Sequence, residues 1–433
     1  MNMSARLLYD ICHTKKTESK MYQFIDSVDP REHDAFVKAH PLCDLLQSSA
    51  WTKVKSNWDH QIVGLRKRSR LATSALILIR RLPLGLCMMY IPRGPIMDLT
   101  DEEMTRSFFQ ALKAWAKKQR CIFIKMDPAV LLRSYPYGTP QPEEDPAALR
   151  CIENMKQAGA IHHGFPLMIS DSVQPRFSMG VEACDDLDAQ LPQSTIRSRN
   201  VAIRKQVKVA EASIEELPLF AEVMHSTENR KHIHLRDEEY FNRLMCAYKE
   251  HAHLFLARID VPAYHAGLCQ EEEQIRLQLQ DPELGRKAAR KLNQRLTQLT
   301  QEKASIAPLL EKYPQECVAA GGLMVGFGKT AEMLYAGMNE DFRTFRPQYL
   351  IYCTQFAYAF ERGYQYVSMG GVEGTLKDGL SVYKANFNPT VKELIGEFDL
   401  PVHPMLYRMS MWLLKKTRFM MFMMFCLNLL ANA

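Results

Sequence analysis

The segment between residues 266 and 313 constrains the fold more than any other part of this sequence. Two stretches rich in Gln, Glu, Arg and Leu, Ala266–Gln280 and Arg286–Tyr313, are separated by the turn-like DPELG. The second stretch carries a heptad seam with one polar member, at Leu292, Leu296, Leu299, Lys303, Ile306 and Leu310. This spacing predicts an antiparallel helical hairpin, a two-stranded coiled coil that projects from its domain.

The hairpin interrupts a predicted sheet, because apolar runs of strand length flank it on both sides. His253–Ile259 precedes it and Cys317–Val325 follows it, and we expect these strands to pair. Elsewhere the 433 residues alternate between strands and helices, which predicts an α/β (α+β) fold with two lobes, each around one sheet. The expected organisation is a loose N-terminal extension (1–20), a first lobe (21–165), a second lobe (166–265 and 314–402), the helical arm (266–313) and an apolar C-terminal tail (403–433).

The other elements follow from hydrophobic periodicity. Strands are expected at Met21–Ile25, Leu71–Ile79, Cys121–Met126, Arg176–Val181 and in YQYVSMGG, and helices at Pro30–Ala39, Glu102–Lys118, Ala147–Gly159, Ile214–Glu228, Asp237–Lys249 and Pro347–Arg362.

Composition and cysteine usage narrow the class of protein. The net charge of +6 permits an anionic partner without requiring one. The 11 cysteines form no C-x-x-C pair and no Cys/His zinc spacing, which is typical of reduced thiols in a cytosolic protein and predicts no metal site. The first twenty residues do not have the pattern of a secretory signal.

The end of the chain is unusually apolar. Phe419–Leu430 is a run of twelve residues, fewer than the roughly twenty needed to cross a bilayer. Two interpretations remain open. The tail is either a final helix docked on the protein or an interfacial membrane anchor that places basic residues beside a Met/Phe face.

A run of five basic residues without an acid lies at Arg197–Lys208. On a helix, Arg197, Arg204 and Lys208 would fall near one face. A solvated helix face is one explanation, but such faces normally mix charges of both signs, so the absence of acids favours a phosphate-binding face.

Lys384 is a lone lysine in the aromatic and apolar run SVYKANF, shortly after the glycine-rich MGGVEG. A lysine between strand-forming residues is usually a solvated edge residue. Here the glycines before it would let the backbone approach a ligand closely, which makes Lys384 a candidate for a site. Asp127 ends the buried strand CIFIKM and either caps a turn or acts at a site, with capping favoured from the local sequence.

Seven motifs occur in a fixed order: WTKVKSNWD, IPRGPIMD, FIKMDPAV, MLYAGMN, YVSMGGVEG, SVYKANF and ELIGEFDLP. In this order they resemble the Fem family of peptidoglycan bridge-forming aminoacyltransferases, of the FemX, FemA and MurM type. The resemblance covers about Met21 to Val402, and the inserted hairpin is similar to that of the FemA and MurM branch. It implies two acetyltransferase-like (GNAT-like) lobes.

The resemblance also implies a reaction. An aminoacyl group would pass from aminoacyl-tRNA to an amine on the stem peptide of a peptidoglycan precursor, which builds the interpeptide bridge of the cell wall. The expected acceptor is lipid II, with the nucleotide-linked UDP-MurNAc-pentapeptide as the alternative. No cofactor is implied, and the expected location is the cytoplasm, with peripheral contact at the inner face of the plasma membrane.

Individual residues match family positions. Lys384 resembles the lysine that stabilises charge as the ester carbonyl is attacked, and Tyr383 the aromatic residue that helps place the acceptor end. Lys55 and Arg204 resemble positions that hold the phosphates of the precursor, although the spacing of basic residues before Arg204 differs from the family pattern.

Further matches leave alternatives open. Tyr335 resembles a cleft-lining position, with a core tyrosine as the alternative, and Asp127 resembles a family acid for which binding is favoured over action as a base. Five cations of the hairpin are candidates to meet tRNA phosphates, or else form a solvated flank of the coiled coil: Arg286, Lys287, Arg290, Lys291 and Arg295.

The sequence leaves two alternative functions to compare with this one. An acetyl-CoA-dependent N-acetyltransferase on this fold needs a glycine-containing pyrophosphate loop before its main helix, but the corresponding stretch Asp341–Gln348 (DFRTFRPQ) contains no glycine. A non-catalytic scaffold at the membrane surface would use the hairpin and the tail to hold partners.

Overall fold

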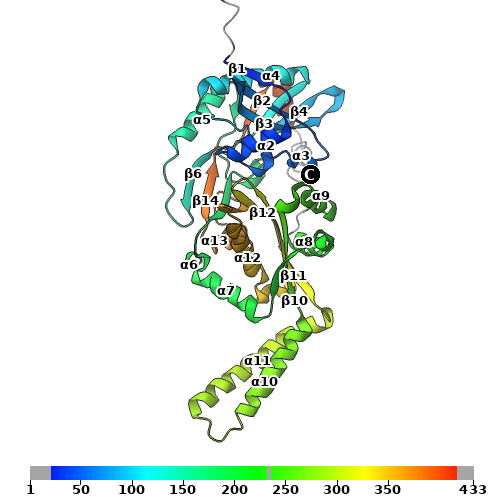
Figure 1. Cartoon of the computed structure of the whole chain (residues 1–433), viewed down its shortest axis with the longest axis vertical. Helices are drawn as coiled ribbons and strands as arrows, with labels where there is room; N and C mark the ends of the chain where they lie inside the picture. Colours follow the sequence, from blue (N-terminus) through cyan, green and yellow to red (C-terminus); the bar gives the residue numbers. More distant parts are fainter. Residues whose placement is uncertain (1–20, 232–235, 417–433) are drawn as a thin grey trace, which may run out of the picture.

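Two lobes lie one above the other along the long axis of the molecule, and the arm projects from the second lobe (Figure 1). The computed structural model describes residues 21–231 and 236–416, so the predicted N-terminal extension and the apolar run Phe419–Leu430 lie outside the described residues. The mixed α/β class predicted from the sequence is confirmed.

The first lobe is built on a seven-stranded sheet. Its order is β1 (Tyr22–Ile25), β2 (Asp59–Lys67), β3 (Arg70–Arg81), β4 (Cys87–Ile91), β5 (Cys121–Met126), β15 (Phe398–Pro401) and β7 (Ile161–His162). Its helices are α2 (Pro30–Ala39), α3 (Trp51–Val54), α4 (Glu102–Lys118) and α5 (Pro146–Gln157). An aspartate caps α2, α4 and α5 by accepting hydrogen bonds from N–H groups of the first turn, which explains where these helices begin.

The second lobe is built on an eight-stranded sheet. Its order is β6 (Leu131–Pro136), β14 (Thr390–Leu394), β8 (Phe177–Glu182), β13 (Tyr366–Val372), β12 (Thr330–Met338), β11 (Cys317–Phe327), β10 (Ala252–Ile259) and β9 (Lys208–Ala212). Its helices are α6 (Leu187–Gln190), α7 (Gln193–Arg204), α8 (Leu217–Lys231), α9 (Glu238–Tyr248), α12 (Pro347–Glu361) and α13 (Gly379–Ala385), and α14 (Pro404–Lys416) ends the described chain.

Helices α8 and α12 cover opposite faces of the second sheet. Gly321 of β11 lies against Phe220 of α8, and its neighbour Gly322 lies against Ile351 of α12. Successive residues of a strand point to opposite faces, so these two contacts place the helices on either side. The small residues of β11 therefore let both helices approach the sheet.

The arm has the predicted form. It consists of α10 (Val261–Gln278) and α11 (Arg286–Lys312), and the break between them falls at the predicted DPELG. Leu268 and Ile275 of α10 are buried with Leu299 and Ile306 of α11, which are members of the predicted seam. The flanking strands β10 and β11 pair in antiparallel fashion, as expected.

The two lobes exchange strands, which the sequence did not predict. Strand β6 follows β5 in the chain but pairs with β14 in the second sheet. Strand β15, from near the end of the described chain, lies between β5 and β7 in the first sheet. The boundary expected near residue 165 divides the sequence, but it does not divide the sheets.

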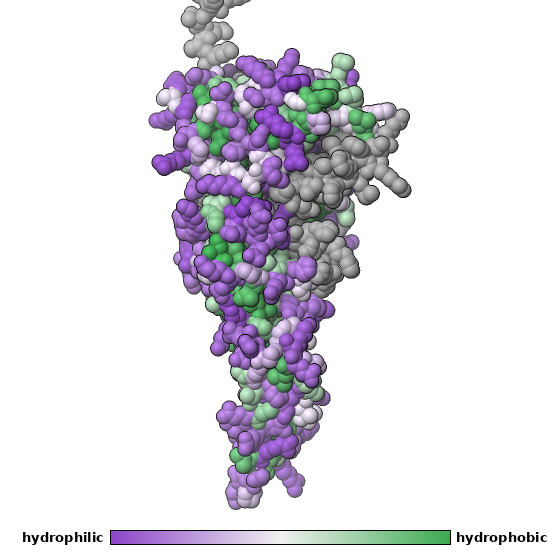
Figure 2. Space-filling model, turned by 90° about the vertical axis from the view of Figure 1, so that its right-hand side faces the viewer, coloured by the Kyte–Doolittle hydropathy of each residue, from purple (hydrophilic) through white to green (hydrophobic). Residues whose placement is uncertain are grey.

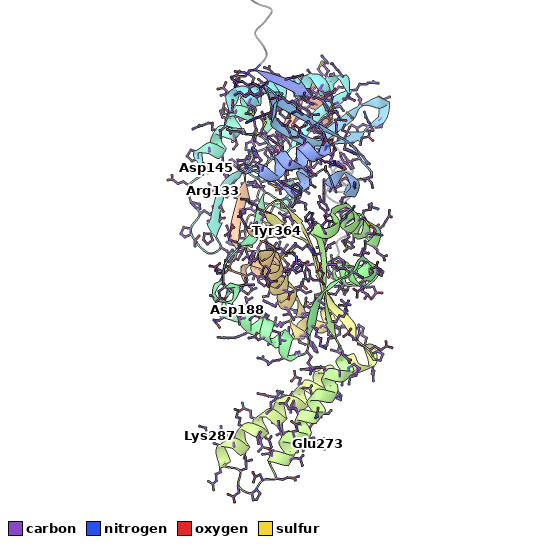
Figure 3. All side chains as sticks on the ribbon, viewed as in Figure 1. Arg133, Asp145, Asp188, Glu273, Lys287 and Tyr364 are labelled. Atoms are coloured by element: carbon purple, nitrogen blue, oxygen red, sulfur yellow. The ribbon has the colours of Figure 1, made fainter. Side chains whose placement is uncertain are left out.

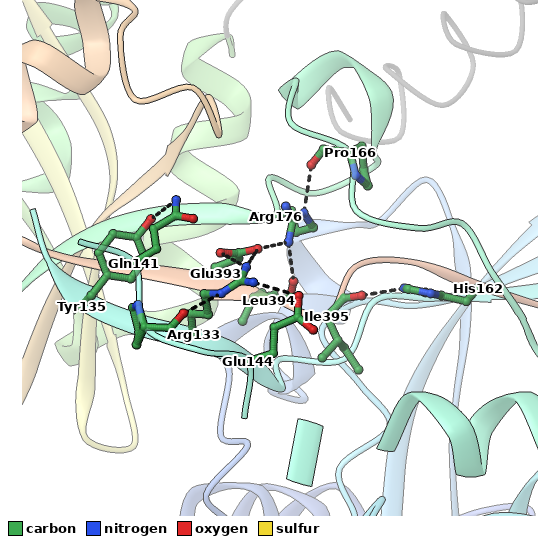
Figure 4. Close-up of polar contacts among 11 residues, drawn as sticks. Arg133, Tyr135, Gln141, Glu144, His162, Pro166, Arg176, Glu393, Leu394 and Ile395 are labelled. Carbon is green, nitrogen blue, oxygen red and sulfur yellow. Dashed lines mark hydrogen bonds and ion pairs between the residues drawn. The ribbon is translucent and has the colours of Figure 1, made fainter. Parts of the chain in front are cut away.

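Buried ion pairs hold the exchanged strands in place. Glu393 of β14 binds Arg176 at 2.6 Å and Arg133 of β6 at 2.9 Å, and Arg133 also binds Glu144 at 2.8 Å (Figure 4). At the other exchange, Lys125 of β5 binds Asp399 of β15 at 2.9 Å. Removing one partner of such a cluster would leave a buried charge uncompensated.

Candidate active site

Lys384 lies on a helix, and the strand expected for its segment is wrong. Asp378 caps α13 by accepting hydrogen bonds from the N–H groups of Leu380 and Ser381 and from the Ser381 hydroxyl. This cap outweighs the strand preference of the Val-Tyr pair that follows. The Lys384 side chain is only 4% exposed, and its ammonium donates a hydrogen bond of 2.9 Å to the carbonyl of Gly371.

The glycine pair that precedes Lys384 belongs to strand β13 and does not form a turn after it. The pairing of β13 with β8 shifts register between Ser368 and Gly371, and Gly370 has a positive φ of 79°. A Cβ at Gly371 would lie 2.3 Å from the Pro175 side chain, so only glycine fits there. The irregular strand thus presents its carbonyl to the lysine.

A cavity of about 490 Å³ lies beside this helix in the second lobe. Strands β12 and β13 run parallel but pair only as far as Glu332 and Ser368, and the cavity is lined by later residues of β12. The other walls come from the start of α12 and from α13, with Arg343, Arg346, Gln348, Tyr349, Tyr352 and Tyr383 among the lining residues. The structure therefore brings the predicted Tyr383 to the wall of this cavity, whereas its neighbour Lys384 is not among the lining residues.

The walls of this cavity carry the groups that an anionic, aromatic ligand requires. Arg346 is the N-cap residue of α12, where the helix dipole also favours negative charge. Arg343 lies on the 3-10 segment just before it, 3.2 Å from Glu340, an acid that also lines the cavity. Within the described residues, the Tyr383 hydroxyl and the Gln348 carbonyl oxygen are buried without a hydrogen-bond partner. Buried polar atoms are nearly always paired in folded proteins, so these two point to a polar ligand.

The first lobe has a parallel strand pair that corresponds to β12 and β13, but its two strands do not separate. Strands β4 and β5 stay paired to their last residues, Ile91 and Met126. Asp127 follows directly, 2% exposed, and forms an ion pair of 3.3 Å with Arg93 and accepts a hydrogen bond of 2.9 Å from the Tyr90 hydroxyl. Burial raises the pKa of Asp127 to about 7, although Arg93 opposes the shift. Its contacts in this structure are therefore internal.

Lys55 belongs to a cationic cluster between the lobes that includes a residue missed from the sequence. Lys55 is buried at the end of α3, which packs against α9, and its ammonium lies 5.3 Å from the Trp51 ring. Burial and the nearby charge of Arg236 lower the pKa of Lys55 to about 7. Arg236 lies 3.4 Å from the Tyr335 hydroxyl, so the predicted Tyr335 belongs to the same cluster.

Arg204 does not belong to the cluster of Lys55 and Arg236. It is the last residue of α7, at the far end of the second lobe from α3, and it lines a cavity of about 410 Å³ at the base of the arm (Figure 1). The basic run is not one helix face, because the chain turns after Arg204 and Lys208 lies on β9. The structure thus places Arg236, and not Arg204, beside Lys55.

The five candidate cations of the arm differ in their contacts and exposure. Arg295 pairs within the arm itself, with two of its guanidinium nitrogens 2.7 Å from the carboxylate of Glu271. Arg286, Lys287, Arg290 and Lys291 are exposed on the first turns of α11. Figure 3 shows Lys287 near this end of the arm, directed away from the helix pair.

Comparison with known proteins assigns the chain to a family. A model of the FemAB family matches residues 28–415. The chain belongs to the FemAB family. The resemblance predicted from the seven motifs is confirmed.

FemAB relatives in sequence include the lipid II:glycine glycyltransferases of Staphylococcus epidermidis and Staphylococcus aureus. Each is 28% identical to this chain, over 404 and 405 residues that cover 88% of it and 94% and 93% of the relatives. The crystal structure of FemX is similar with a TM-score of 0.72 and 27% identity, covering 89% of this chain and 99% of that one.

Proposed function

We propose that this FemAB protein is a tRNA-dependent aminoacyltransferase that adds an amino acid to the stem peptide of a peptidoglycan precursor, with lipid II as the acceptor. The observation that carries the proposal is the family match over residues 28–415. In support, Tyr383, which precedes Lys384 on α13, lines a cavity with cationic and aromatic side chains. The names of the staphylococcal relatives support lipid II as the acceptor.

The aminoacyl end of the tRNA fits the cavity of the second lobe. Its bases can stack on the rings of Tyr349, Tyr352 and Tyr383, and its phosphates can pair with Arg343 and Arg346. The buried Tyr383 hydroxyl would then gain the hydrogen-bond partner that it lacks among the described residues.

The aminoacyl ester is already activated, so the protein needs only to align the two substrates and to stabilise the negative charge that develops. The neutral amine of the acceptor attacks the ester carbonyl, a C–N bond forms, and the carbonyl oxygen becomes an oxyanion. Lys384 stabilises that negative charge. Collapse breaks the C–O bond, and the amine proton ends on the ribose oxygen that leaves.

The phosphates of the acceptor fit the cluster of Lys55 and Arg236. These cations come from different lobes, so a bound pyrophosphate would bridge α3 and the segment before α9. Its negative charge would also favour the protonated form of Lys55, against burial and the charge of Arg236, which both lower the pKa of this lysine.

This coupling predicts a pH dependence of acceptor binding. In the protein without bound acceptor, Lys55 has a pKa of about 7, so it is charged below that pH and loses its proton above it. Binding of an anion favours the charged form, so a proton is taken up above pH 7. Affinity for UDP-MurNAc-pentapeptide should fall by up to about tenfold per pH unit between about pH 7 and about pH 9 in titration calorimetry. A Lys55→Met variant should bind weakly and lose this slope; an equal slope in both proteins contradicts the assignment.

The exposed cations of the arm predict a salt-dependent contact with tRNA. Replacing Arg286, Lys287, Arg290 and Lys291 by glutamine should weaken binding of aminoacyl-tRNA by about tenfold or more at low salt and flatten its dependence on salt. A control with glutamine at Arg68, Arg70, Lys117 and Lys118, exposed cations of the first lobe, removes the same charge and should bind normally. Equal losses of tRNA affinity in both variants would show that only the net charge of the protein matters, and would contradict a contact through the arm.

A transfer assay tests the proposed function directly. The purified protein is incubated with lipid II and a set of charged tRNAs, and the modified precursor is detected by mass spectrometry. We expect one aminoacyl group to be added, and the productive tRNA identifies the amino acid. Acetylation from acetyl-CoA, or binding without transfer, would support the acetyltransferase or the scaffold instead.

A further inference from the structure

Helix α14 presents an apolar face to the outside of the first lobe. Tyr407 points inward, where its ring packs 5.5 Å from that of Phe123 and its hydroxyl donates a hydrogen bond to Asp399. Met405, Met409 and Trp412, at helical steps of four and three, are 84%, 53% and 54% exposed. Concentration of such residues on one helix of thirteen residues differs from scattered apolar residues, which need no explanation.

The charge of α14 has a single sign. Arg408 is exposed beside the apolar face, Lys415 and Lys416 end the helix, and the helix contains no acid. An apolar helix face whose own helix carries only cations is complementary to an anionic lipid surface. Within the described part of the chain, no helix combines the length and the apolarity that a membrane span requires.

A second apolar segment lies next to this helix. Phe165, Leu167 and Met168 are exposed in the loop after β7. His163, at the start of that loop, and Tyr407 of α14 lie 2.8 Å and 3.0 Å from the same oxygen of Asp399. One buried carboxylate therefore contacts both α14 and the residue at the start of the loop, and further along the loop the Leu167 carbonyl accepts a hydrogen bond from the N–H of Gly374 in the second lobe.

We propose that α14 and the loop at 165–168 form a surface that docks on a bilayer containing anionic lipids, with the helix lying in the interface. The biological reason rests on the proposed function, because a lipid-linked acceptor is reached at a membrane. The physical argument does not, because it depends only on exposure and charge. The arm projects from the other lobe (Figure 1).

Vesicle co-sedimentation with the full-length protein tests the proposal. The protein should partition onto vesicles of phosphatidylglycerol and phosphatidylcholine, and less onto phosphatidylcholine alone. Serine at Met405, Met409 and Trp412 should reduce partitioning by about tenfold or more, and Arg408→Gln should reduce the preference for phosphatidylglycerol. Leu277→Ser, which changes an exposed leucine of the arm, should bind like the parent.

The apolar run after α14 supplies the competing outcome. If serine at Phe419, Phe422 and Phe425 abolishes binding while the α14 variant still binds, the run carries the contact and the proposal is overturned. Matching thermal unfolding curves show that the variants fold. The vesicles contain no precursor, so a protein that transfers in solution but ignores vesicles contradicts this inference alone, and one that binds vesicles but transfers nothing contradicts the proposed function alone.

Discussion

Replacing Lys384 by methionine should lower the rate of aminoacyl transfer by about 10²–10³, which is the usual effect of losing one donor to a developing oxyanion. Methionine has an unbranched apolar side chain one atom shorter than that of lysine, so the buried side chain still fills most of its place on α13. The hydrogen bond to Gly371 is lost, but that carbonyl lies on a strand held by β8. Single-turnover transfer from charged tRNA measures the effect.

The control is Lys377→Met, which removes an exposed lysine just before α13. That variant should transfer at the parental rate. Lys384→Met should also bind the precursor and the charged tRNA with near-parental affinity, because the charge it stabilises exists only during reaction. If binding and rate fall by equal factors, Lys384 holds a substrate and does not stabilise the transition state.

Glu393→Gln should lower the free energy of unfolding by about 3–5 kcal/mol, because it leaves Arg176 buried without a compensating charge. Both side chains are 3% exposed, and Glu393 is also bound by Arg133 (Figure 4). The glutamine keeps the shape of the side chain, so the change isolates the charge. Urea denaturation followed by circular dichroism gives the value.

The comparison is with an exposed pair. Glu102 and Arg106 form an ion pair of 3.2 Å on the surface of α4, with more than half of each side chain exposed. Glu102→Gln should change stability by less than about 1 kcal/mol. A similar small loss for Glu393→Gln would mean that water or a rearranged carboxylate reaches Arg176, and the cluster would not hold the exchanged strands.

The sequence predicted most of the elements because their signals are local. Helices α2 and α4 begin and end at the predicted residues, and the heptad seam placed α11 of the arm, whereas α10 begins five residues before the predicted Ala266. The strand predicted for the segment of Lys384 was wrong because its Val-Tyr pair favours a strand, whereas the cap from Asp378 stabilises a helix. The deciding interaction is a hydrogen bond from a side chain to the nearby backbone, and hydrophobic periodicity carries no information about such bonds.

The candidate site was only partly accessible from sequence because its parts meet through long-range packing. Tyr383 and Lys384 were found through adjacent motif residues. Arg236 has no motif around it that marks a phosphate site, and only the packing of α3 against α9 brings it to Lys55. The surface of the arm is mostly hydrophilic, so its four exposed cations do not stand out by composition alone (Figure 2).

The exchange of strands has a consequence for how the chain folds during synthesis. Strand β15 completes the first sheet between β5 and β7, yet it is made only after the second lobe and the arm. During synthesis, the edge of β5 that pairs with β15 therefore stays unpaired until Pro401 has left the ribosome. The arm is built from contacts between neighbouring helices, so it can form as soon as it emerges. Ribosome-bound chains that stop short of β15 should expose the first lobe to proteases, although nearly all of its sequence has already been made.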